Sequence, residues 1–168
     1  MGVHHYKLDI VPEALAIRYL DKPHEFDLNE VEPFEHIPPP QPLLARLRNM
    51  LPRENSWGPC EEFETGDKWG SDLRILHDRE PRSDSPVMSI QFRYSALVYE
   101  IELLKAFLGI VSDHGHWLYS VGTGQFLKPE FEGVLADFKQ TDAFRALDDF
   151  EGAMVDAASA VKRPKYLG

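Results

Sequence analysis

The sequence predicts an α+β fold, an antiparallel sheet with helices packed mainly on one of its faces. Several short segments of the 168-residue chain alternate apolar and polar side chains, which is typical of strands with one buried face. Other segments place apolar side chains three or four residues apart, as amphipathic helices do. Segments of the two kinds are interleaved along the chain, and no internal repeat is visible.

Alternation with a period of two marks four strands, of which residues 87–94 form the clearest. The other three cover residues 4–11, 72–77 and 116–121. Gly122, Thr123 and Gly124 fit a hairpin turn that leads to a short return strand at residues 125–127. Glycines and a proline interrupt the stretch 56–70, and we expect a strand flanked by loops there.

Helical spacing of leucines predicts a short helix over residues 43–51, which Pro52 stops. Residues 97–111 present a broad apolar helical face, and Ser95 is the expected N-cap of that helix. A further helix is expected to open at Pro129. Beyond it we expect a helix over 143–150 and a tail that is helical and then frayed.

The length predicts one domain over residues 1–168, which includes a Pro-rich acidic arm over residues 21–42. The prolines of the arm exclude a continuous helix and disfavour a central strand. Apolar anchors along the arm indicate that it lies against the domain; they are Phe26, Leu28, Val31, Phe34 and Ile37. Without the arm the elements follow the order β-α-β-β-α-β, which favours a split β-α-β (ferredoxin-like) core.

The chain is acidic, because 28 Asp and Glu residues outnumber 18 Lys and Arg residues and the formal net charge is -10. An acidic surface repels phosphate backbones, so we expect no direct nucleic-acid partner. The same charge speeds the capture of a basic protein and makes that capture sensitive to salt. In the alternative interpretation the charge serves solubility alone.

The chain contains no run of about 18 apolar residues, so we expect no transmembrane helix and no membrane partner. Its first residues lack the basic region and apolar run of a secretion signal. Cys60 is the single cysteine, which excludes a disulfide framework within one chain and a metal site made of thiolates alone. Together these features favour a cytoplasmic location.

Two tryptophans and a group of acidic side chains make residues 57–69 the candidate partner-binding surface. The candidate residues are Trp57, Glu61, Glu62, Glu64, Asp67 and Trp69. Tryptophan is enriched at the energetic centres of protein interfaces, and surroundings of glycine, proline and acid explain these two poorly as core residues. In the alternative interpretation the glutamates form a solvated edge whose like charges oppose strand pairing.

The segment 113–116 is the candidate metal site. Its ligands would be Asp113, His114 and His116, with His77 recruited from another strand. Imidazole and carboxylate groups suit zinc or another divalent transition metal. In the alternative interpretation Gly115 simply ends the preceding helix and the histidines bind nothing.

The sequence offers no nucleophile or phosphate-binding motif, and a solvated edge explains Glu61, Glu62 and Glu64 better than paired catalytic carboxylates. It therefore favours a non-catalytic, acidic protein-binding module without a cofactor. In size, charge and fold class the chain resembles many toxin-neutralising immunity proteins, which implies an inhibitor of a basic protein. Two alternatives stay open. One is a metal-dependent hydrolase using Asp113, His114 and His116. The other is a structural domain that associates with itself, for example as a homodimer.

Overall fold

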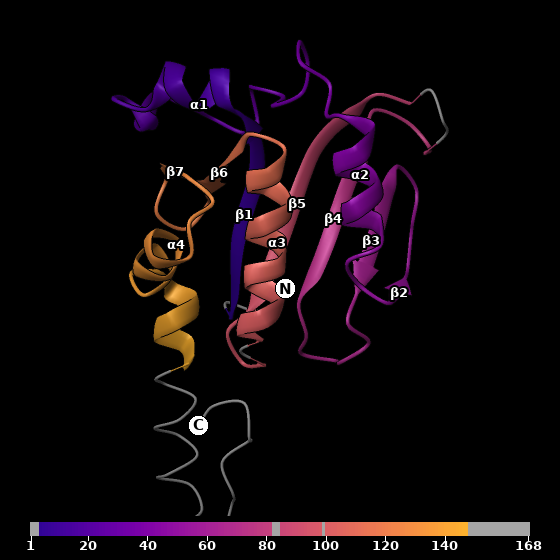
Figure 1. Cartoon of the computed structure of the whole chain (residues 1–168), viewed down its shortest axis with the longest axis vertical. Coiled ribbons are helices and arrows are strands. Elements are labelled where there is room, and N and C mark those ends of the chain that lie inside the picture. The colour runs from indigo at the N-terminus through magenta and orange to yellow at the C-terminus, as the bar shows by residue number, and fades with distance from the viewer. Residues whose placement is uncertain (1–3, 82–84, 99, 148–168) are drawn as a thin grey trace, which may run out of the picture.

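The computed structural model describes residues 4–81, 85–98 and 100–147, and its central element is a seven-stranded sheet (Figure 1). The strand order is β2-β3-β4-β5-β1-β6-β7, and all paired neighbours are antiparallel. The strands are β1 His5–Pro12, β2 Arg53–Glu54, β3 Cys60–Glu64, β4 Asp72–His77, β5 Val87–Ser95, β6 His116–Ser120 and β7 Gln125–Leu127. The predicted α+β fold is therefore confirmed, whereas the finer split β-α-β core stays a prediction.

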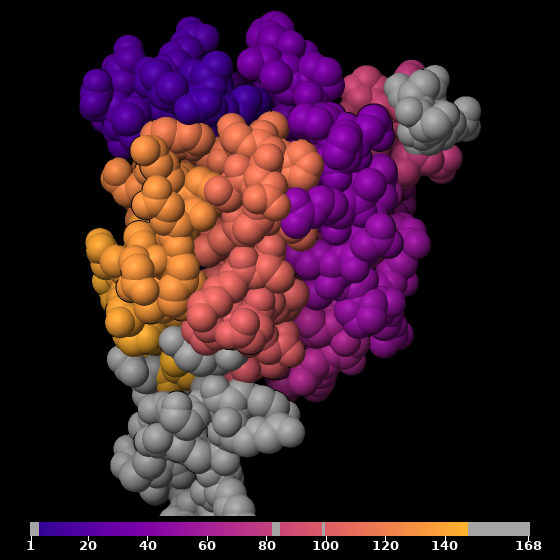
Figure 2. All heavy atoms as spheres, viewed as in Figure 1, coloured from indigo at the N-terminus to yellow at the C-terminus, as the bar shows by residue number. Residues whose placement is uncertain are grey.

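Three helices lie on one face of the sheet, in front of it in Figure 1. They are α2 Gln41–Arg48, α3 Ile101–Asp113 and α4 Phe131–Phe138. As spheres, the purple, salmon and orange atoms of these helices cover this side of the molecule (Figure 2). The short α1, Glu13–Tyr19, and the 3₁₀ turn η1, Pro23–Glu25, follow β1 directly and lie at one end of the sheet.

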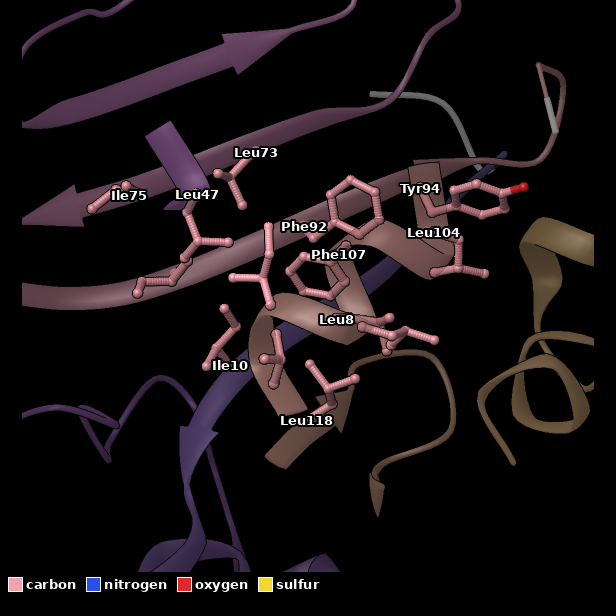
Figure 3. Close-up of a cluster of buried hydrophobic side chains, with 14 of the residues drawn as sticks. Leu8, Ile10, Leu47, Leu73, Ile75, Phe92, Tyr94, Leu104, Phe107 and Leu118 are labelled. Atoms are coloured by element: carbon pink, nitrogen blue, oxygen red, sulfur yellow. The ribbon is translucent and has the colours of Figure 1, made fainter. Parts of the chain in front are cut away.

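The main core fills the space between the sheet and these helices. Alternate side chains of β1, β4 and β5 point into it, among them Leu8, Ile75 and Phe92, each with no exposed surface. Phe107 of α3 stacks on Phe92, with ring centroids 4.3 Å apart (Figure 3). The apolar face of the sheet, which repeats every second residue, thus packs against the apolar faces of the helices, which repeat every 3.6 residues.

A smaller apolar cluster lies on the opposite face of the sheet. Val11, Ala16, Phe26 and Phe126 form it, so α1 and the arm cover β6 and β7 on this side. The other side chains of this face, on β3, β4, β5 and on β1 as far as Asp9, are mainly polar. We call this part of the sheet the polar face.

Two expectations need correction, and two elements were not expected. Ser95 is not a helix cap, because it pairs with His5 as the last residue of β5, and α3 begins only at Ile101 with Glu100 as its N-cap. Helix α1 and the two-residue strand β2 were not predicted. The anchor Ile37 is 47% exposed, although Phe26 and Phe34 do bury the arm against the domain.

Residues 142–147 are helical, in line with the expected helix after Thr141, while the rest of that helix and the tail lie outside the described residues. Within the described ranges, no helix combines the length and the apolar character needed to cross a membrane.

Candidate functional site

A row of side chains crosses the polar face from strand to strand. Register partners bring together Glu62 of β3, Arg74 of β4, Gln91 of β5, Asp9 of β1 and Tyr119 of β6. Cross-strand partners lie close enough for direct contact between side chains. Residues distant in sequence therefore form one continuous polar surface.

The arginines of this row and the next are matched by carboxylates. Arg74 donates from Nε to Glu62 Oε1 at 3.0 Å, and the Trp57 indole donates to Glu62 Oε2 at 3.1 Å. Arg93 holds Asp72 through two hydrogen bonds of 2.8 and 2.5 Å, and both side chains are almost fully buried. These pairs tie β3, β4 and β5 together by charge.

Asp9 occupies a different environment. Its residue is only 3% exposed, and the Gln91 side-chain amide donates to Asp9 Oδ2 at 3.1 Å. No cation of the described residues forms an ion pair with it. Burial raises the pKa of Asp9 to about 6, against the smaller opposing effects of the Gln91 hydrogen bond and the Lys7 charge.

Two surface hollows meet at Asp9, and Ser89 and Gln91 line both of them as well. One, of about 250 Å³, extends to Trp57 and Arg74. The other, of about 410 Å³, extends to Tyr119, Lys7 and the arm residues 26–29. We call these two neighbouring hollows together the groove, and Asp9 lines both of them.

A further hollow of about 430 Å³ lies between α1 and the arm. Its charged lining residues are all exposed; they are Arg18, Glu30, Glu32, Glu35 and His36. Because exposed charges remain hydrated, this hollow has no feature comparable with the buried carboxylate of Asp9.

The structure divides the predicted partner-binding residues between the two faces of β3 and the loop that follows it. Trp57 and Glu62 lie together on the polar face, and Glu64, on the same face, forms an ion pair with Arg53 at 3.4 Å. Asp67 and Trp69 lie in the loop between β3 and β4, where Asp67 Oδ1 accepts a hydrogen bond from the Trp69 backbone. Trp57 and Trp69 are 53% and 50% exposed.

Glu61 points the other way, toward α2, and is not part of that surface. Arg48 donates two hydrogen bonds of 2.9 Å to its carboxylate, and His77 Nε2 lies 2.7 Å from it. Burial acts to raise the pKa of Glu61, but Arg48 and His77 outweigh it and lower the pKa. Glu61 is therefore placed as a structural ion pair between β3 and α2.

The four candidate metal ligands are not brought together. Asp113 accepts a hydrogen bond from Arg46 at 2.7 Å, and the Nδ1 atoms of His114 and His116 donate to nearby backbone carbonyl oxygens. His77 lies on β4, which β5 and β1 separate from β6. In residues 4–81, 85–98 and 100–147, no three His, Cys, Asp or Glu side chains are placed to hold a metal ion.

The central residues of the groove, Asp9, Ser89 and Gln91, were missed by sequence reasoning. Each occupies a polar position of a correctly predicted strand, and such positions are expected to face water. The one available signal was an acidic side chain in the middle of an apolar strand, between Leu8 and Ile10. That signal does not reveal burial, which depends on which strands and loops lie alongside.

The buried charge of Asp9 predicts a pH-dependent gain in stability for Asp9→Asn. A folded-state pKa above the unfolded value favours folding at low pH, and this contribution is lost as the pH rises through about 6. From about pH 3.5 to about pH 7.5, the stability of the variant relative to wild type should rise by about 3 kcal/mol. Urea unfolding at several pH values measures this difference.

The exposed Asp21 provides the matched control, because Asp21→Asn removes the same charge from a side chain in water. We expect a nearly constant difference from wild type for this variant across the same pH range. An equally flat profile for Asp9→Asn would contradict the prediction.

Comparison of the chain with models of protein families, with curated proteins and with solved structures found no match.

Proposed function

We propose that the chain is a binding module for a basic protein, of the inhibitor or immunity type, and that the partner contacts the polar face beside Trp57. The observation that carries this proposal is the position of Trp57. The residue is 53% exposed and lines the groove, and the hydrogen bond from its indole to Glu62 holds the side chain in place. A large aromatic side chain with a fixed orientation at the surface is typical of the centre of an interface.

The charge of the chain supports a basic partner. The net charge is -10, and Asp9 of the polar face and Asp27 of the arm both line the groove. Such a surface attracts a cationic protein over a distance of about 10 Å at ordinary ionic strength. Attraction of this kind raises the association rate more than it lowers the dissociation rate.

The edges of the sheet support a partner on the face more than self-association along an edge. The edge strands β2 and β7 contain two and three residues. So few backbone groups provide little for a second copy to pair with.

The partner is to be isolated from the source organism with the full chain as bait, and its affinity then measured by calorimetry with purified proteins. We expect a positively charged partner in a 1:1 complex whose association slows about tenfold or more between low and high salt. Trp57→Ala should weaken binding by about thirtyfold, as expected for a central aromatic contact.

The control is Ile17→Ala, which truncates another exposed apolar side chain, on α1. We expect it to leave the affinity unchanged. A partner without excess positive charge, or equal affinities for wild type and Trp57→Ala, would overturn the proposal.

A further inference from the structure

We propose that Asp9 anchors one arginine side chain of the partner, whose guanidinium group enters the groove between Trp57 and Tyr119. This inference rests on the proposed function, because it names the chemical group that the polar face recognises. In this proposal Asp9 is a specificity-determining residue. Its carboxylate lies beneath the surface, and Asp9 is not part of a recognisable sequence motif.

The first argument is charge. The arginines of the polar face already have carboxylate partners, since Arg74 binds Glu62 and Arg93 binds Asp72. Asp9 receives a hydrogen bond from the neutral amide of Gln91 instead. A buried carboxylate without a cation is costly, and an arriving cation would remove most of that cost.

The second argument is the shape and chemistry of the walls. Tyr119 is the direct cross-strand partner of Asp9, and Trp57 lines the hollow on the other side. Aromatic faces near a carboxylate suit a planar cation that can stack and donate hydrogen bonds at once, as guanidinium does. Asp27 adds a second carboxylate near Tyr119, and Asp9 and Asp27 both raise the pKa of the Tyr119 hydroxyl after the larger effect of burial.

The third argument is size. The two hollows measure about 250 and 410 Å³, at or below the lower part of the range for small-molecule pockets, about 300 to 1,000 Å³. Spaces of this size accept a single side chain of a docked protein. Lys7, which lines the larger hollow, acts to lower the pKa of Asp9, but burial outweighs it and the pKa stays raised.

The fourth argument is the stability that Asp9 costs the folded chain. A carboxylate whose pKa is raised by burial destabilises the fold at neutral pH. Groups that destabilise a fold are concentrated at binding and catalytic sites, where function retains them. The unfavourable burial of Asp9 is therefore typical of a residue that binds a ligand.

The test uses capped peptides with one central arginine, lysine or citrulline, added to the isotope-labelled full chain at low salt. Citrulline keeps the shape of arginine but lacks its charge. We expect the arginine peptide to shift the NMR signals of the Gln91 side-chain amide and the Trp57 indole. The citrulline peptide should bind at least about tenfold more weakly, and the lysine peptide should fall between the two.

Variants locate the site. Asp9→Asn should lower the affinity for the arginine peptide by at least about tenfold. The charge-matched Asp21→Asn should leave that affinity unchanged. The Asp9 variant is expected to be more stable than wild type at neutral pH, so a loss of binding cannot come from unfolding. Equal binding of arginine and citrulline peptides, or unchanged binding to Asp9→Asn, would overturn the anchor.

The purified partner separates this inference from the proposed function. If Trp57→Ala weakens binding of the partner but Asp9→Asn does not, the proposed binding function is supported and the arginine anchor is wrong. If no basic partner exists but the arginine peptide binds in a manner that requires Asp9, the anchor stands and the proposed function is wrong. If Asp9→Asn lowers the affinity for the partner by about tenfold or more, the proposed function and the arginine anchor are both supported.

Discussion

Phe107→Ala is expected to destabilise the protein by about 3 to 5 kcal/mol. Phe107 is fully buried in α3, and its ring stacks on Phe92 in the middle of the sheet (Figure 3). Truncation removes the apolar contacts between the helix layer and β5, and it leaves a cavity that the rigid sheet cannot fill. Urea unfolding should show a lower midpoint with an unchanged slope.

Phe131→Ala is the matched control, because it makes the same truncation at a partly buried position at the start of α4. We expect a clearly smaller loss there, since solvent already reaches the ring. Equal losses for the two variants would show that the contact of α3 with the sheet is not the centre of the core.

Asp72→Ala is expected to cost a similar amount, about 3 to 5 kcal/mol, because it leaves the buried Arg93 guanidinium without its counter-charge. Arg93 is 5% exposed, and its Nη1 atom already has no hydrogen-bond partner among the described residues. Asp72 accepts the two hydrogen bonds that Nε and Nη2 of the Arg93 side chain donate. Thermal and urea unfolding measure the loss.

A double-mutant cycle with Arg93→Met distinguishes the buried charge from a general effect of truncation. The double variant contains neither charge, and we expect it to be more stable than Asp72→Ala alone. Losses that simply add would contradict an interaction between the two side chains.

Much of the fold was predictable from the sequence because it follows from local alternation. The strand over residues 72–77 was predicted with the bounds that β4 has, and β5 extends one residue beyond its prediction. In both, the apolar positions are Leu73, Ile75, Ile90 and Phe92, and all four are fully buried. A buried face repeats every second residue whatever the order of the strands, so the pattern is readable without the tertiary structure.

The predicted ends of strands and helices were wrong where tertiary contacts compete with the local preference of the residues. Ser95 is a good helix cap by residue type, but its backbone N–H donates to the Ser71 hydroxyl and its own hydroxyl donates to the Trp69 carbonyl oxygen. These contacts hold Ser95 in β5 and delay α3 to Ile101. No property of the residues around Ser95 announces a partner 24 positions away.

The candidate site was likewise predictable only in part from the sequence. The sequence singled out Trp57 and Glu62, which do lie together, since tryptophans among glycines and acids are unusual for a core. It grouped Glu61 with them because the two glutamates are neighbours and identical. In a strand, neighbours point to opposite faces, and only the packing of Arg48 against β3 shows which glutamate is covered.

Composition and periodicity by themselves determined the acidic character, the α+β class and the places of the main strands, because these depend on single residues and their nearest neighbours. The tertiary structure alone decided the polar face, the groove and the buried state of Asp9. Strand order sets Asp9 between Gln91 and Tyr119, and the arm forms the outer wall of the hollow beside it. The protonation of a carboxylate depends on how much water reaches it, and that depends on neighbours distant in the chain.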